Sequence, residues 1–156
     1  MNKKFTFFYG GPFSQWYPAP FTVDGVEYTC AEQYMMAKKA LVFQDDFAHR
    51  MIMGNKDPSK QKYWGRKVEN FNVEVWNSVS KDIVARASFA KFTSTNHLKN
   101  LLLETEGTIL VEASPYDSIW GIGLSSTDPR ASNPEEWLGT NWLGQILTDL
   151  RDGMLS

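Results

Sequence analysis

Residues 114–123 read SPYDSIWGIG and follow the β-branched run TILV at residues 108–111, which predicts a buried strand. The loop places the carboxylate of Asp117 three residues before Trp120. Gly121 permits tight backbone turns or the close approach of a ligand. A flat apolar ring, a nearby acid and unhindered backbone suit a planar polar ligand with a bond to be cleaved. The same residues also fit a structural role, in which Asp117 caps a turn beside a core tryptophan.

The segments before this strand predict two helices. Residues 96–106 carry a leucine stripe that ends at Gly107, and a long central helix is expected after Asn72, which can act as its N-cap. We expect the buried side of the long helix to hold Val75, Val79, Ile83, Ala87 and Ala90.

A last helix is expected to begin at Asn141, with Asn141 as its N-cap and Trp142 directly after it. The backbone N–H groups at such an N-terminus would suit a phosphate. The apolar side of this helix is formed by Leu143, Ile146, Leu147 and Leu150.

The N-terminal part of the chain begins with an alternating pattern that predicts a short strand over residues 4–9. Gly10 leads into a loop with Ser14 and Trp16, and loops of this kind often carry binding groups. The loop aromatics also fit packing on the core. Asp24–Gly25 stands between two runs of β-formers and predicts an antiparallel hairpin.

Thr29 and Glu32 match a capping box, with Thr29 as N-cap of a helix that runs to Leu41. Glu32 and Lys39 are seven residues apart, so they lie two turns apart on one helix face. Taken alone, these residues fit a cap and a solvated lysine better than they fit chemistry.

Two further helices are marked by their ends. Residues 45–53 predict a helix with a left-handed stop at Gly54. Asp57 and Pro58 then predict an N-cap followed by proline at the first helical position.

Length and composition fit one domain over residues 1–156. The net charge of −2 argues against broad binding to a nucleic-acid backbone, and 14% aromatic residues suit a pocket for one base or sugar. The single cysteine, Cys30, excludes an intrachain disulfide and suggests a reducing compartment. Two histidines without ligand spacing make a zinc site unexpected. We find no signal peptide or membrane-spanning run, and expect a cytoplasmic protein without a membrane or obligate protein partner.

Four segments, in this order and over most of the chain, resemble motifs of the NADAR (YbiA-like) family. The first is FYG at residues 8–10 with FSQW at 13–16, and the second is AEQY at 31–34 with KA at 39–40. The third is DSIWGIG at 117–123, and the fourth is NWLG at 141–144, followed by Leu147. The family often has Asn where this chain has Gln15, which alters the reach of any amide contact there.

The resemblance implies a helix-rich α+β domain with a small antiparallel sheet that hydrolyses N-glycosidic bonds. Two substrate classes go with such proteins: phosphoribosyl intermediates of riboflavin biosynthesis, and ADP-ribose attached to guanine, including guanine in nucleic acid. Neither class requires a cofactor or a metal. A module that binds ADP-ribose or a nucleotide without cleaving it is the alternative function.

By the same resemblance, Glu32, Lys39 and Asp117 are expected to be catalytic. The carboxylates would stabilise an oxocarbenium-like transition state or activate water. Lys39 would either bind phosphate or attack the opened sugar to form a Schiff base. The substrate-binding residues are expected to be Gly10, Ser14, Trp16, Trp120, Gly121, Asn141 and Trp142.

Overall fold

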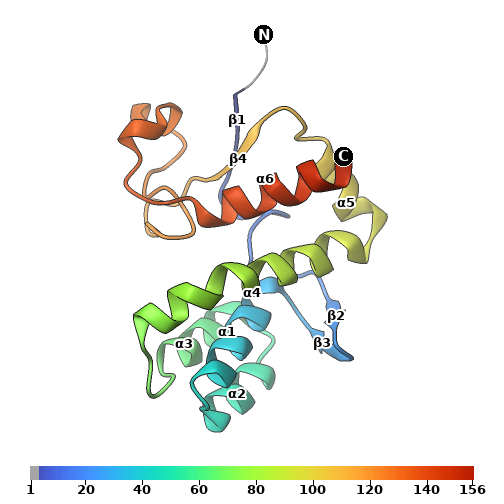
Figure 1. Cartoon of the computed structure of the whole chain (residues 1–156), viewed down its shortest axis with the longest axis vertical. Coiled ribbons are helices and arrows are strands. Elements are labelled where there is room, and N and C mark those ends of the chain that lie inside the picture. The colour runs from blue at the N-terminus through green and yellow to red at the C-terminus, as the bar shows by residue number, and fades with distance from the viewer. Residues whose placement is uncertain (1–3) are drawn as a thin grey trace. The chain divides into compact units, whose positions relative to one another are not determined.

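The computed structural model describes residues 4–156, which divide into two compact units (Figure 1). The first unit combines the N-terminal segment up to Ser14 with Thr95–Ser156, and the second is the continuous segment Gln15–Ser94. The expected helix-rich α+β architecture is confirmed.

The first unit is built on two strands from opposite ends of the sequence. Strand β1 (Phe5–Phe8) pairs in parallel with β4 (Ile109–Glu112), so that Phe5 lies opposite Ile109. One hydrophobic cluster of this unit is formed by Val111, Ile122, Leu124 and Ala131, with Phe5, Phe7 and Trp137 packed against them. Its other elements are α5 (Asn96–Leu103), the 3₁₀ turns η1 (Pro129–Ser132) and η2 (Pro134–Glu136), and α6 (Trp142–Leu155).

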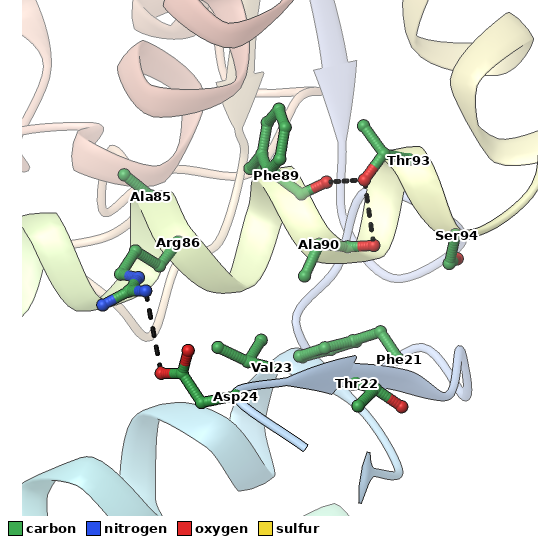
Figure 2. Close-up of a pocket in the computed structure, with 10 residues that line it drawn as sticks. All are labelled: Phe21, Thr22, Val23, Asp24, Ala85, Arg86, Phe89, Ala90, Thr93 and Ser94. Carbon is green, nitrogen blue, oxygen red and sulfur yellow. Dashed lines mark hydrogen bonds and ion pairs between the residues drawn. The ribbon is translucent and has the colours of Figure 1, made fainter. Parts of the chain in front are cut away.

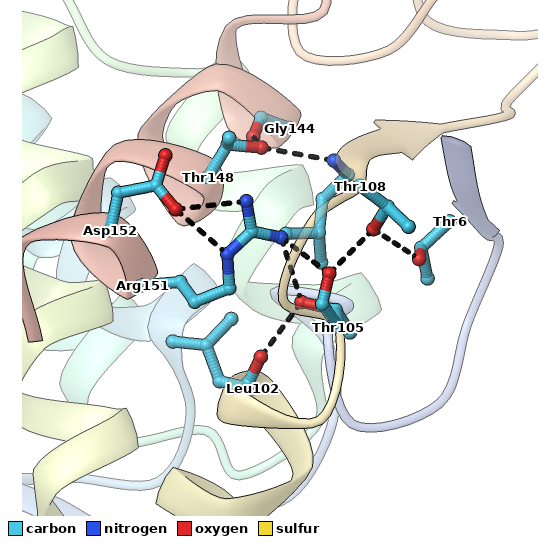
Figure 3. A network of polar contacts seen from close by, with 9 residues as sticks. Thr6, Leu102, Thr105, Thr108, Gly144, Thr148, Arg151 and Asp152 are labelled. Atoms are coloured by element: carbon cyan, nitrogen blue, oxygen red, sulfur yellow. Dashed lines mark hydrogen bonds and ion pairs between the residues drawn. The ribbon is translucent and has the colours of Figure 1, made fainter. Parts of the chain in front are cut away.

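A buried arginine joins α6 to the turn between α5 and β4 (Figure 3). Arg151 is 3% exposed, and its Nη1 donates to the carbonyl oxygen of Thr105 at 2.8 Å and to the Thr105 hydroxyl at 3.0 Å. Arg151 also pairs with Asp152 at 2.9 Å. The Thr108 hydroxyl donates to the Thr105 carbonyl and lies 2.6 Å from that of Thr6 on β1. One polar network thus ties the last helix to β1.

The second unit packs three helices around α1 (Ala31–Val42), whose residues 31–37 are all buried. These helices are α2 (Asp46–Met53), α3 (Pro58–Arg66) and α4 (Val73–Ser94). Strands β2 (Phe21–Val23) and β3 (Val26–Tyr28) form the expected antiparallel hairpin.

Local signals placed several ends correctly. Asp24 and Gly25 both have positive φ, as a two-residue hairpin turn requires. Asp57 caps α3 with Pro58 at its start, as expected. The left-handed stop at Gly54 is wrong, because Gly54 has φ −82° and closes α2 in a right-handed conformation.

The expected buried face of α4 is displaced by about one residue. Asn72 caps the helix, since its Oδ1 accepts from the amides of Glu74 and Val75. Val75, however, is 44% exposed. The buried positions are Trp76, Ser80, Val84, Ala87, Ser88, Lys91 and Phe92. Three of these positions, Ser80, Ser88 and Lys91, are polar, and a pattern of apolar residues alone does not reveal them.

Candidate functional site

The loop at residues 114–123 folds around the carboxylate of Asp117. Its Oδ1 accepts hydrogen bonds from the amides of Ile119 at 2.9 Å and Trp120 at 2.8 Å. This is the turn-capping geometry that the sequence left open as a structural role. Within residues 4–156, the second carboxylate oxygen accepts no hydrogen bond. Asp117 is half-buried, so one oxygen shapes the loop and the other is available for chemistry.

Trp120 and Trp142 meet edge to face, with ring centroids 5.6 Å apart and an interplanar angle of 80°. Both side chains are half-buried, so neither is an ordinary core tryptophan. Gly121 has a packing role, because a Cβ there would lie 2.8 Å from the Glu112 carbonyl oxygen on β4. The missing side chain therefore lets the loop lie close against the strand, and a ligand is not needed to explain the glycine.

The phosphate site expected at the start of α6 depended on free backbone N–H groups, and this premise is wrong. The amides of Trp142 and Leu143 donate to the carbonyl oxygens of Ile119 and Trp120, at 3.1 and 3.2 Å. The first two N–H groups of this helix are thus already used by the loop at residues 114–123.

Asn141 also makes no side-chain cap, and it has the left-handed φ of 54°. Its Nδ2 donates to the Leu110 carbonyl oxygen at 3.1 Å, and its Oδ1 accepts from the Glu112 amide at 3.0 Å. The fully buried side chain therefore fastens α6 to β4.

The glycine-rich turn near the N-terminus divides its expected binding residues between the two units. Gly10 is exposed with φ 77°, and the Ser14 amide donates to the Gly11 carbonyl oxygen at 2.9 Å. Trp16 belongs to the second unit and is 43% exposed. The ammonium of Lys62 lies 5.9 Å from the centroid of its ring. Their roles in substrate binding stay predictions.

Glu32 does not close the N-terminal turn of α1. The N-cap is Cys30, without a side-chain hydrogen bond, and the Oε1 of Gln33 accepts from the Thr29 amide at 2.7 Å. The expected capping box of Thr29 and Glu32 is therefore wrong. The side chain that reaches back to the Thr29 amide is that of Gln33 and not that of Glu32. Glu32 is 4% exposed, and its backbone amide donates to the Gln15 carbonyl oxygen at 3.0 Å. Capping does not explain this buried carboxylate.

Lys39 lies two turns further along α1 in an aromatic setting. Its ammonium is 4.6 Å from the centroid of the Phe71 ring and 5.9 Å from that of Trp76. Burial lowers the pKa of Lys39, the charge of Glu32 raises it, and that of Arg66 lowers it. Glu32 and Lys39 are thus brought within electrostatic reach, as expected from their spacing.

A second lysine with an altered pKa was missed in the sequence. Lys91 is 1% exposed, with its Nζ 4.9 Å from the Phe92 ring centroid and 5.7 Å from that of Tyr17. Burial lowers its pKa to about 7, and Cys30 raises it. The signal was present in the spacing 76, 80, 84, 87 and 91, which continues the buried face of α4.

A separate groove runs between β2 and α4 and encloses about 660 Å³ (Figure 2). Phe21 and Val23 of the hairpin face Ala90 and the neighbouring turns of the helix. At one end Arg86 and Asp24 approach to 3.7 Å, and both are well exposed. None of the residues predicted for the site lines this groove.

Among the described residues, no three His, Cys, Asp or Glu side chains gather as a metal site would require. No described helix has the length and apolar character needed to cross a membrane.

The NADAR domain model matches residues 7–155 of this chain. The chain is 41% identical over 164 residues to N-glycosidase R617 of Acanthamoeba polyphaga mimivirus, which covers 97% of this chain and 96% of that protein. It is 41% identical over 80 residues to the chloroplastic riboflavin biosynthesis protein PYRR of Zea mays, covering 51% of this chain and 11% of PYRR. The NMR structure of E. coli YbiA superposes with a TM-score of 0.81 and 29% identity, over 99% of this chain and 87% of YbiA.

Proposed function

The chain belongs to the NADAR family and is an N-glycosidase, and we propose that it cleaves a base from a phosphorylated ribose. The preferred substrate class is a phosphoribosylamino-pyrimidine, as in the early intermediates of riboflavin biosynthesis. The name of the maize relative supports this class.

The observation that carries the proposal is the buried carboxylate of Glu32 on the same helix face as Lys39. Cleavage of an N-glycosidic bond develops positive charge at the anomeric carbon. A carboxylate shielded from water stabilises that charge more strongly than an exposed one, because the local dielectric is lower. Glu32 is therefore the residue that we assign to the reacting carbon.

In the proposed reaction, the bond between C1′ and the base nitrogen breaks, and its electron pair stays on the nitrogen. That nitrogen takes up a proton as the base leaves. Water adds to C1′, and its proton passes to the carboxylate of Glu32. The products are the free base and ribose 5-phosphate. We assign Asp117 a proton-transfer or electrostatic role and Trp120 a stacking role, each tested separately below.

Two roles for Lys39 are compatible with this reaction. As a charged group, Lys39 binds the substrate phosphate. As a neutral amine, it attacks C1′ of the opened sugar, and the base leaves with the electron pair of the C1′–N bond and a proton. The resulting imine between Lys39 and the sugar is then hydrolysed by one water, which releases ribose 5-phosphate and the free amine. The lowered pKa of Lys39 makes the neutral form easier to reach.

The test is release of the free base. The full chain is incubated with a phosphoribosylamino-pyrimidine and, in parallel, with an oligonucleotide that carries ADP-ribose on guanine. Release from the first substrate supports the preferred class, and release from the second alone overturns it in favour of ADP-ribosylated nucleic acid. If the chain binds ADP-ribose but releases a base from neither substrate, the proposed enzymatic function is overturned in favour of the binding module. Borohydride added during turnover traps an imine at Lys39 only on the covalent route.

A further inference from the structure

We infer that Arg66 and Lys39 together form a subsite for the phosphate of the substrate, and that Phe71 and Trp76 form its apolar wall. This inference rests on the proposed function. It deepens that function by choosing the phosphate-binding role for Lys39 and by adding Arg66, which neither the sequence motifs nor the relatives' names point to.

The packing of α3 on α1 brings the two cations into the same region of the second unit. Gly65 lies directly against Met36, since a Cβ at Gly65 would overlap the Met36 side chain. Lys39 is one turn after Met36 on α1, and Arg66 is the next residue after Gly65 on α3. The charge of Arg66 acts on Lys39 accordingly.

The two cations make no ion pair within the described residues, although the charge of Glu32 acts on Lys39 over a longer distance. Within the described chain, neither Lys39 nor Arg66 has a carboxylate oxygen within the 4.0 Å of an ion pair. Two like charges held near each other repel, so the arrangement favours an anion between them. The planar guanidinium of Arg66 suits two phosphate oxygens at once, and the ammonium of Lys39 supplies a compact charge.

The wall beside the cations is made of two rings, of which Phe71 is 46% exposed. Phe71 packs edge to face against Phe43, with ring centroids 5.4 Å apart, and Trp76 is 9% exposed. Both rings lie over the Lys39 ammonium. They lower the local dielectric around the charges, which strengthens a contact with phosphate.

The order of charges along α1 fits the two ends of a sugar phosphate. Glu32 is the carboxylate that acts on Lys39, and it lies about 10 Å along the axis of α1 from Lys39. A ribose 5-phosphate laid along this face would place C1′ toward Glu32 and its phosphate toward Lys39 and Arg66.

Charge along the sequence supports the same direction. Residues 38–67 contain eight Lys or Arg and only three Asp, although the whole chain has a net charge of −2. This surplus favours the approach of an anion to the part of the second unit that holds the end of α1, α2 and α3.

The experiment measures binding without turnover. The full chain, with Glu32→Gln to prevent reaction, is titrated calorimetrically with ribose 5-phosphate and with ribose. We expect Arg66→Ala and Lys39→Met each to weaken ribose 5-phosphate binding about tenfold or more, as loss of a charged hydrogen bond does, and to leave ribose binding unchanged. Arg66→Lys should retain part of the affinity.

Lys67→Ala is the matched control, because it removes the same charge from the neighbouring residue, whose ammonium lies 5.3 Å from the Tyr63 ring centroid. Equal losses with Lys67→Ala, or equal affinity for ribose and ribose 5-phosphate, would overturn the subsite. Turnover is measured separately on the chain with Glu32 intact. A lack of turnover on every substrate would contradict the proposed function and not the phosphate subsite, so the two failures are distinguishable.

Discussion

The side-chain oxygen of Gln33 accepts the Thr29 amide at 2.7 Å, and this contact separates the structural and chemical duties at the start of α1. The Nε2 of Gln33 also donates to the carbonyl oxygens of Ile52 and Asn55, at 3.1 and 3.2 Å. Gln33 thus holds together the turn before α1 and the end of α2. The adjacent Glu32 is buried without serving as the cap.

Glu32→Gln is expected to reduce turnover at least a hundredfold, as loss of a general base does, and to change the melting temperature little. The reason is that Gln keeps the size of the side chain but cannot take a proton from water. Gln33→Ala is the matched variant. It should lower the free energy of unfolding by about 1–3 kcal/mol, because buried partners lose their hydrogen bonds. Thermal melts and base release measure both effects, and normal turnover by Glu32→Gln would place the chemistry elsewhere.

Asp117→Asn should reduce turnover strongly at nearly unchanged stability. Asn retains the oxygen that accepts the amides of Ile119 and Trp120 but lacks the negative charge. Asp117→Ala removes the turn as well and should cost about 1 kcal/mol more in unfolding free energy. Near-normal turnover by the Asn variant would leave Asp117 with the turn-capping role alone.

Trp120→Ala should weaken substrate binding by about 1–3 kcal/mol, the value of an aromatic ring stacked on a base. Trp120→Phe keeps a flat ring and should keep part of the binding. Each Trp120 variant is combined with Glu32→Gln to prevent turnover, and the measurement is the shift in melting temperature when substrate is added. If both variants shift as the parent does, Trp120 only packs against Trp142.

Lys91 predicts a pH dependence of stability. Burial lowers its pKa from the usual 10.5 to about 7. Between these values the unfolded chain binds a proton that the folded chain does not. The free energy of unfolding should therefore rise with pH from about 7 upward, by up to about 1.4 kcal/mol per pH unit from this group.

Urea unfolding of the parent and of Lys91→Met, from pH 7 to 9.5, measures this slope. The Met variant should lose the slope, and Lys60→Met on the exposed side of α3 should keep it. Parallel curves for the parent and Lys91→Met would show that Lys91 is charged in the folded protein at these pH values.

Features set by neighbouring residues could be predicted from sequence, and those set by distant contacts could not. Asp24–Gly25 and Asp57–Pro58 define their turn and cap through their own backbone preferences, so both were correct. Asn141 has the same local signal as a capping residue. Its side chain instead hydrogen-bonds to the backbone of Leu110 and Glu112, some thirty positions earlier in the sequence. The residues around Asn141 give no local signal of these contacts.

The same distinction applies to the candidate site. The spacing of Glu32 and Lys39 was enough to predict that they share one face of α1, and the charge of Glu32 acts on Lys39 there. Arg66 reaches that pair only through the packing of Gly65 on Met36, which joins two helices. Lys91 was hidden because a lysine at a buried helix position is read as a solvated residue until the neighbouring helix is known.

The parallel pairing of β1 with β4 has a consequence for synthesis on the ribosome. Residues 15–94 form a continuous compact unit, and all of its chain has been synthesised before β4. Phe5 and Phe7 on β1, by contrast, must wait for Ile109 and Val111, about a hundred residues later. At about 5–20 residues per second, the N-terminal strand stays without its partner for on the order of 5–20 s. During this interval nascent chains expose an unpaired aromatic strand, which is the segment that a trigger-type chaperone would shield.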